Sequence, residues 1–111
     1  MNITIYQGES KSLVYELTDD VGNPVDLTFI DAEWRLTGRT DETPLIIKTL
    51  GAGITYTDAA LGLLTVELTP EDTELAPGLY RRELRLSSGS TQRHTADTGT
   101  IKIVDSLFIT G

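Results

Sequence analysis

The chain offers few side chains that could perform acid–base or nucleophilic chemistry. Its 111 residues include one histidine, His94, and no cysteine. A histidine can act as a general base when a nucleophile lies beside it. Its neighbours Gln92, Arg93, Thr95 and Ala96 supply no obvious nucleophile. We therefore expect an exposed strand or loop histidine, and we predict that the protein is not an enzyme.

Acidic residues gather in segment 19–26, which contains Asp19, Asp20, Asn23 and Asp26. Oxygen ligands from such a loop could hold calcium. The segment lacks the alternating ligand spacing and the closing glutamate of an EF-hand, and its Asp, Asn, Gly and Pro residues are those that make turns. The pattern favours a turn and leaves cation binding by this loop open. No metal site and no cofactor are predicted.

The run Gly51-Ala52-Gly53 has a superficial likeness to a phosphate-binding loop. Such a loop needs a strand before it and a helix N-terminus after it. No helix is predicted after Gly53, so the run is expected to be a turn.

A short helical turn is predicted near residues 70–75. Thr69 can cap it, and Pro70 takes the first helical position. Glu71 and Asp72 then occupy the first turn, where the helix dipole favours acidic side chains. Capping explains these carboxylates better than a cation site does.

Pro77 and Gly78 turn the chain into a strand that contains Tyr80. In β-sandwiches with a tyrosine corner, the tyrosine hydroxyl bonds to backbone a few residues upstream. We expect Tyr80 to bond near residues 74–76 and to clamp a crossover between sheets. Together with Thr69, these residues are predicted to form a structural corner.

Arg82 is unusual because strand alternation places it on the same face as Tyr80 and Leu84, which is the expected core face. A lone buried guanidinium is costly. Arg82 is therefore paired with a carboxylate, placed at the sheet rim with its stem on the core, or exposed to a partner subunit. The rim position is favoured, and Arg82 is a candidate for a protein interface.

The length of the chain is enough for a single domain, residues 1–111, with its own core. Seventeen acidic and nine basic residues give a net charge of −8, which repels phosphate backbones and anionic lipid surfaces. We predict no nucleic-acid partner and no membrane partner. Residues 1–6 lack the pattern of an export signal, so a soluble protein without a signal peptide is expected.

Apolar alternation and β-rich composition predict a chain of strands separated by turns. Trp34, the only tryptophan, is expected to be the largest core anchor. About eight strands with almost no helix indicate a sandwich or barrel. The predicted strands cover residues 3–5, 11–18, 32–37, 45–50, 54–57, 63–68, 79–86 and 100–104, with a short edge segment over 27–30.

The end of the chain is more apolar than a free terminus usually is. It contains Leu107, Phe108 and Ile109. These three residues are expected either to pair as a last strand or to dock on another subunit. They are candidates for a protein interface, and self-association is a hypothesis that follows from them.

The order and spacing of several short segments resemble the immunoglobulin-like N-terminal domain of tailed-phage baseplate upper proteins and related small phage or prophage virion proteins. The resemblance covers nearly the whole chain. The segments include Gln7-Gly8-Glu9-Ser10, Gly22-Asn23-Pro24-Val25-Asp26, Gly53-Ile54-Thr55, Leu68-Thr69-Pro70-Glu71-Asp72 and Pro77-Gly78-Leu79-Tyr80.

The resemblance implies an immunoglobulin-like β-sandwich of about seven to nine mostly antiparallel strands. It also implies a non-enzymatic structural or assembly subunit of a phage or prophage tail or baseplate. Its partners would be other tail or baseplate proteins, and its location the virion after assembly in the bacterial cytoplasm. In that family longer segments follow the domain, whereas this sequence stops at Gly111, which favours a stand-alone or accessory subunit.

A second function class is a small immunoglobulin-like binding module that holds a carbohydrate or protein ligand. Such a module uses loops at one end of the sandwich, with clustered aromatic or polar side chains. The predicted loops are poor in aromatic residues, which disfavours this alternative.

Overall fold

The computed structural model describes residues 2–19, 21–39, 43–88 and 92–105. The described chain is almost entirely β-structure, so the predicted all-β class is confirmed. Its elements are β1 (Asn2–Tyr6), β2 (Lys11–Glu16), β3 (Asp31–Gly38), β4 (Pro44–Leu50), β5 (Gly53–Asp58), η1 (Ala59–Leu61), β6 (Leu63–Leu68), β7 (Gly78–Ser88) and β8 (Gln92–Val104).

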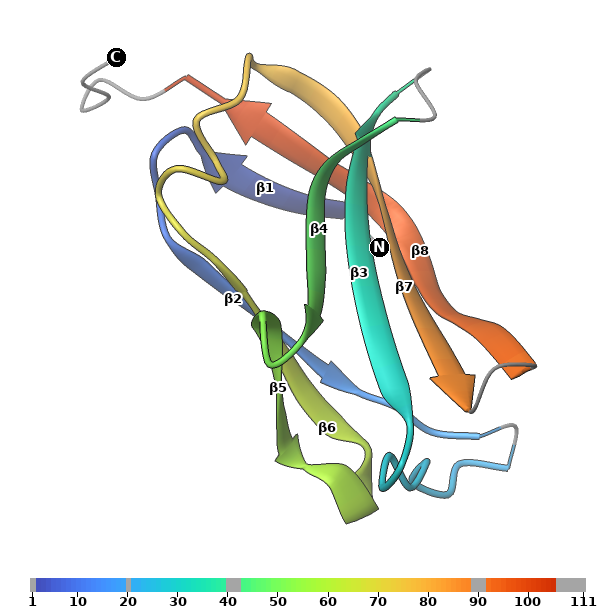
Figure 1. Cartoon of the computed structure of the whole chain (residues 1–111). Helices are drawn as coiled ribbons and strands as arrows, with labels where there is room; N and C mark the ends of the chain where they lie inside the picture. The colour runs from blue at the N-terminus through green and yellow to red at the C-terminus, as the bar shows by residue number, and fades with distance from the viewer. Residues whose placement is uncertain (1, 20, 40–42, 89–91, 106–111) are drawn as a thin grey trace.

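The eight described strands form one hydrogen-bonded sheet in the order β1-β8-β7-β3-β4-β5-β6-β2. Neighbouring strands are antiparallel except at two places, where β1 runs parallel to β8 and β4 runs parallel to β5. The β4–β5 link is short, because only Thr49 with Gly53 and Leu50 with Ile54 are in register. The sheet curls until it is nearly barrel-like, with β1 and β2 at its two edges (Figure 1).

One apolar core fills the space inside the curled sheet. Strand alternation sends every second side chain inward, and Trp34 on β3 is fully buried, as predicted. Burying one large apolar side chain stabilises the fold by about 1.5–3 kcal/mol. The buried apolar residues are Ile5, Leu13, Leu17, Leu27, Ala32, Trp34, Leu36, Ile54, Leu64, Val66, Leu68, Leu84, Leu86, Ile101 and Ile103.

The helical turn predicted near residues 70–75 is wrong, because this segment forms separate hydrogen-bonded turns. The Asp72 N–H donates to Thr69 O at 3.0 Å. The side-chain hydroxyl of Thr73, rather than another backbone N–H, reaches Pro70 O at 3.2 Å. The successive backbone bonds that would build a helix are therefore interrupted.

Within the described chain, the one helical element is η1, at Ala59–Leu61. The Asp58 side chain caps it by accepting from the Leu61 N–H at 3.3 Å. It ends at Gly62, whose φ is 73°. A Cβ there would lie 2.5 Å from Leu17 O, so this position needs glycine for both conformation and space.

The edge segment predicted over 27–30 is also wrong. The Ile30 N–H donates to Leu27 O at 3.0 Å and closes a turn. Leu27 is buried and Ile30 is half-buried. Residues three apart point to opposite faces of a strand, so these two side chains could not both reach the core from an extended chain.

Within the described residues, no helix has the length and apolar character needed to cross a membrane.

Candidate functional site

Arg82 lies inside the sheet and not at its rim. It points inward from β7, between Tyr80 and Leu84, and only 3% of its surface is exposed. Its guanidinium forms an ion pair with Asp97 of β8. Its Nη1 also donates to the Tyr15 hydroxyl at 3.0 Å. Of the three arrangements expected for Arg82, carboxylate pairing is the one observed, because a buried charge needs a close opposite charge.

Tyr15 connects this ion pair to Trp34. The Trp34 Nε1–H donates to the Tyr15 hydroxyl oxygen at 3.3 Å, and the same oxygen accepts from Arg82. Burial raises the pKa of Tyr15, and the charge of Arg82 opposes that rise without cancelling it. The hydroxyl therefore stays protonated at neutral pH. The cluster fixes β2 against β3 and β7, and it does not supply a base.

A groove of about 520 Å³ opens between the sheet edges β1 and β2. Ile3, Tyr15, Arg82 and Asp97 contribute to its walls. A hydroxyl also lies there, on Ser12, but it donates to a carboxylate of β6 at 2.7 Å and has no histidine beside it among the described side chains. The groove is also lined by the carboxylates of Glu16 and Asp97, and the second of these is paired with Arg82.

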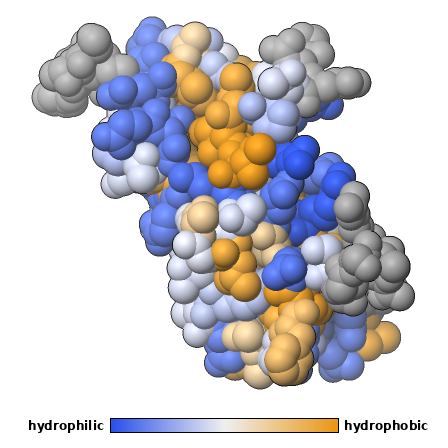
Figure 2. All heavy atoms as spheres, viewed as in Figure 1, coloured by the Kyte–Doolittle hydropathy of each residue, from blue (hydrophilic) through white to orange (hydrophobic). Residues whose placement is uncertain are grey.

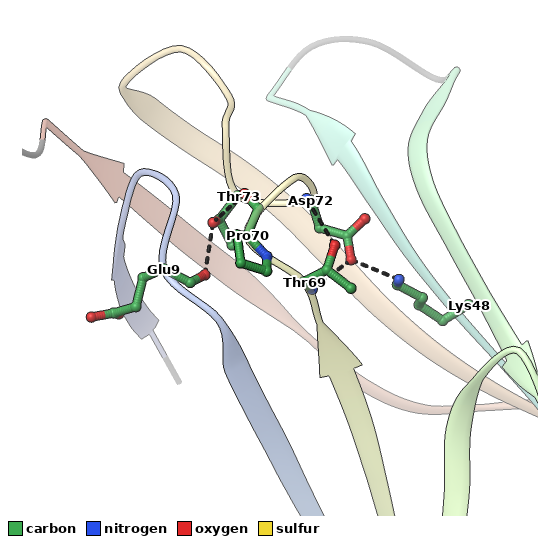
Figure 3. Close-up of polar contacts among 6 residues, drawn as sticks. All are labelled: Glu9, Lys48, Thr69, Pro70, Asp72 and Thr73. Carbon is green, nitrogen blue, oxygen red and sulfur yellow. Dashed lines mark hydrogen bonds and ion pairs between the residues drawn. The ribbon is translucent and has the colours of Figure 1, made fainter. Parts of the chain in front are cut away.

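The first half of the corner is a reciprocal cap between Thr69 and Asp72 (Figure 3). The Thr69 N–H donates to Asp72 Oδ2 at 2.8 Å, and the Asp72 N–H donates to Thr69 Oγ1 at 3.3 Å. Lys48 Nζ of β4 donates to the same Oδ2 at 2.7 Å. Burial alone would raise the pKa of Asp72, but the bonds from Lys48 and Thr69 outweigh it and lower the pKa. The cap thereby connects the corner to β4.

Thr73 connects the corner to the turn between β1 and β2. Its side chain is buried, and its hydroxyl donates to Glu9 O at 2.7 Å and is also within reach of Pro70 O at 3.2 Å (Figure 3). The Gly8 N–H donates back to Thr73 O at 3.4 Å. These bonds give the buried Thr73 hydroxyl an acceptor and connect the corner to the backbone of Gly8 and Glu9.

Tyr80 completes the corner at the start of β7. Its hydroxyl donates to Ala76 O at 2.6 Å, a carbonyl within the range predicted for the clamp. Gln7 Nε2 donates to the neighbouring Leu75 O at 2.8 Å. Pro77 lies between these carbonyls and Gly78, the first residue of β7. The corner residues therefore hold one another and the chain around them, which is a structural role.

The acidic loop uses its carboxylates to make turns. Asp19 Oδ1 accepts from the N–H groups of Val21 at 3.0 Å and Asn23 at 2.9 Å. Asp26 Oδ1 accepts from the Thr28 N–H at 2.9 Å. Hydrogen bonds from Thr28, the larger from its side chain and the smaller from this N–H, lower the pKa of Asp26. In the part of the chain that the structure describes, no three His, Cys, Asp or Glu side chains gather into a group that could hold a metal ion.

A surface that the sequence analysis did not single out lies on the outward side of β4, β3, β7 and β8. Arg35, Arg81 and Arg85 line a hollow of about 720 Å³ there. Arg35 lies directly opposite Ile47 in the sheet, so the two side chains point to the same side. Alternation along β7 adds Leu79 to that side. We call this surface the arginine face.

The arginine face combines positive charge with exposed apolar side chains. Arg35 pairs with Glu33, and Arg85 pairs with Glu83 at 3.1 Å. The face thus gathers three of the nine basic residues of a chain whose net charge is −8. Ile47 is 52% exposed, and Figure 2 shows an apolar patch over β4. Arginine beside exposed aliphatic side chains is typical of protein interfaces.

A second surface feature is the turn at residues 26–31, which we call the Phe29 turn. The Phe29 side chain is 98% exposed, and its φ of 65° lies in the left-handed region. That region costs a non-glycine residue about 1–2 kcal/mol. It is the one described non-glycine residue with a positive φ. Backbone strain of this kind is concentrated at functional sites.

The backbone of the Phe29 turn is fixed from several sides. The Leu27 N–H donates to Ala59 O of η1 at 2.7 Å, and the Tyr56 hydroxyl donates to Ile30 O. Burial and the nearby charge of Asp31 raise the pKa of Tyr56, so this donor is retained at neutral pH. The turn therefore presents an aromatic ring on a rigid base. The sequence signal that could have identified it is the three-residue spacing of two core side chains, Leu27 and Ile30.

Several predicted residues fall outside this description. Leu107, Phe108, Ile109 and Asp20 lie outside the described residues. The backbone of His94 is part of β8, and its side chain is also outside the described part.

No protein-family model, curated protein or solved structure matches the chain.

Proposed function

We propose that this protein is a non-enzymatic structural or assembly subunit that acts through protein–protein contacts in a phage or prophage tail or baseplate. The observation that carries the contact role is the arginine face, where three guanidiniums stand beside exposed Ile47 and Leu79. The tail or baseplate setting is supported by the order of segments from Gln7-Gly8-Glu9-Ser10 to Pro77-Gly78-Leu79-Tyr80. Its partners would be other tail or baseplate proteins, in the virion.

We assign the fold to the immunoglobulin-like sandwiches. In that fold, strands B, E and D share one sheet, and C, F and G share the other, with C′ beside C in variable-type domains. The order β2-β6-β5 corresponds to B-E-D, and β4-β3-β7-β8 corresponds to C′-C-F-G. The two-pair link between β4 and β5 would be the place where the sheets meet.

Two side chains support this assignment independently of strand order. Trp34 is buried on β3, the strand that corresponds to C, where immunoglobulin domains bury a tryptophan. Tyr80 lies near the start of β7, the strand that corresponds to F, and bonds upstream to Ala76 O, as a tyrosine corner does. One departure is that β1 pairs with β8 and not with β2.

The experiment is to purify tail particles from a host that carries the gene and to measure this chain in them by mass spectrometry. We expect the wild-type chain in the particle fraction. The double variant Arg35→Glu with Arg85→Glu should fold but be depleted from particles. Lys11→Glu, an exposed residue at the start of β2, is the matched charge control. Particles that assemble normally without the chain would overturn the proposal.

The alternative, a loop-based module for a carbohydrate or protein ligand, is favoured by a single residue. Phe29 is an exposed aromatic side chain on a loop at one end of the molecule (Figure 1). Aromatic rings on such loops bind sugars and protein anchors. Glycan-array binding that is lost in Phe29→Ala would select this alternative over the tail subunit.

A further inference from the structure

We propose that copies of this chain join head to side, with the Phe29 turn of one copy seated on the arginine face of the next. This rests on the proposed function as an assembly subunit and names a second copy of the chain as one partner. The turn presents an aromatic ring beside carboxylates. The face presents guanidiniums beside aliphatic side chains, so each surface supplies what the other lacks.

The Phe29 turn is already in the shape that docking requires. Its backbone is held by Ala59 O, by the Tyr56 hydroxyl and by the Asp26 carboxylate. Association therefore does not have to order a flexible loop, which removes a common cost of binding. The exposed ring is also the type of side chain that forms the centre of protein interfaces.

Carboxylates flank the turn in sequence, and no basic residue is near it in sequence. Asp26 and Asp31 flank the turn, and Asp58 caps η1, which is hydrogen-bonded to it. Segments 12–34 and 49–80 contain neither Lys nor Arg. Figure 2 shows apolar side chains at the same end of the molecule, which is the lower end in that view. This end is thus an apolar tip with negative charge.

The arginine face fits such a tip in both charge and shape. Guanidinium planes stack on aromatic rings, and their N–H groups can bind carboxylates in pairs. The hollow of about 720 Å³ lined by Arg35, Arg81 and Arg85 has room for one phenyl ring. Ile47 and Leu79, which are 52% and 44% exposed, supply apolar contact beside it.

The two surfaces come from different elements, so the contact is heterologous. The turn belongs to the connection between β2 and β3, and the face belongs to the strands β4, β3, β7 and β8. A heterologous contact generates a ring or an open filament and does not stop at a symmetric dimer. One ring in one hollow makes a small interface, so each contact should be weak, and repetition along a scaffold should strengthen it.

The first test is sedimentation velocity on the purified full chain over a concentration series. We expect species larger than dimers to appear as concentration rises, with weaker association at high salt because the contact is partly electrostatic. Phe29→Gly and the pair Arg35→Gln with Arg85→Gln should each weaken association about tenfold or more. Val14→Ser, on an exposed β2 residue, is the matched control and should associate like wild type.

The second test mixes the two variants, each of which keeps one of the two surfaces and associates only weakly alone. Phe29→Gly keeps an intact arginine face, and the Arg35/Arg85 variant keeps an intact Phe29 turn. Their mixture should form one-to-one heterodimers and nothing larger, since each complex has used its only functional pair of surfaces. Unfolding midpoints near that of wild type establish that both variants are folded.

Two results would overturn the inference: a wild-type chain that stays monomeric at every concentration, or a dimer that survives Phe29→Gly. Failure here is distinct from failure of the proposed function. A monomeric chain that is still found in tail particles would reject head-to-side joining and keep the role as a tail subunit.

Discussion

The corner at residues 69–80 and the Phe29 turn at residues 26–31 are both tight connections fixed by hydrogen bonds, yet they place their side chains oppositely. In the corner, the Thr73 side chain donates to a backbone carbonyl and the Asp72 side chain accepts from Lys48, so both point toward the protein. In the turn, Phe29 points almost wholly into solvent from a strained backbone. The corner stabilises the fold, whereas the turn gives up stability to present a ring. Substitutions in the two regions should therefore change the free energy of unfolding in opposite directions.

Thr73→Val should give the largest effect, a loss of about 2 kcal/mol in the free energy of unfolding. The change keeps the size of the side chain but removes a buried hydroxyl that donates to Glu9 O and reaches Pro70 O, so both carbonyls lose this donor. Thr73→Ser keeps the hydroxyl and is the control, expected to lose less than about 1 kcal/mol. Denaturant unfolding measures both. Equal losses in the two variants would show that the corner does not depend on this hydroxyl.

Tyr80→Phe should lower the free energy of unfolding by about 1 kcal/mol or somewhat more, because the bond to Ala76 O is lost. Tyr6→Phe is the matched control on a side chain that is 54% exposed, and it should change stability by less than about 0.5 kcal/mol. An unchanged unfolding midpoint in Tyr80→Phe would reject the clamp.

Phe29→Gly should raise stability, by about 1 kcal/mol, although it removes a large side chain. Glycine adopts positive φ without strain, and a ring that is 98% exposed has little packing to lose. Thr28→Gly, the neighbouring position with an ordinary φ, should instead lose about 0.5–1 kcal/mol. Thermal unfolding of the two variants measures whether each change raises or lowers stability. A destabilised Phe29→Gly would mean that the ring supports the fold after all.

Asp72→Asn should have the smallest effect, and it should depend on pH. The folded pKa of Asp72 lies below its ordinary value of 3.8, so the carboxylate stabilises the fold above about that pH and loses this contribution as pH falls through the lower, folded value. We expect a cost of about 1 kcal/mol at neutral pH. The unfolding curves of variant and wild type should converge in acid, and a gap that persists there would contradict the role of Lys48.

The alternation of apolar and polar residues was enough to locate most strands. Leu13, Trp34, Val66 and Leu84 each belong to a strand in which most of the alternate side chains are apolar and face the core. Alternation did not reveal the first half of β8. Residues 92–98 are polar except for Ala96, and they are extended because β7 pairs with them. Strand character that comes from a distant partner leaves no local periodicity.

The polar interior was only partly predictable for a related reason. Alternation placed Arg82 inward, but it could not give the register that sets Gly99 opposite Arg82 and Asp97 opposite Leu84. That register, interrupted by an irregularity after Leu84, brings the Asp97 carboxylate to the guanidinium. Likewise, the arginine face became visible only when β3 and β7 were known to be neighbours.

The parallel pairing of β1 with β8 has a consequence for synthesis. Asn2 lies opposite Thr100, so β1 must wait until β8 has been synthesised before the two strands can pair. Contacts so distant in sequence slow folding and leave an unpaired edge exposed during translation. Because β8 also completes one side of the arginine face, a nascent chain lacks that surface until translation has passed this strand. The proposed assembly through the arginine face would therefore begin only after β8 has been made.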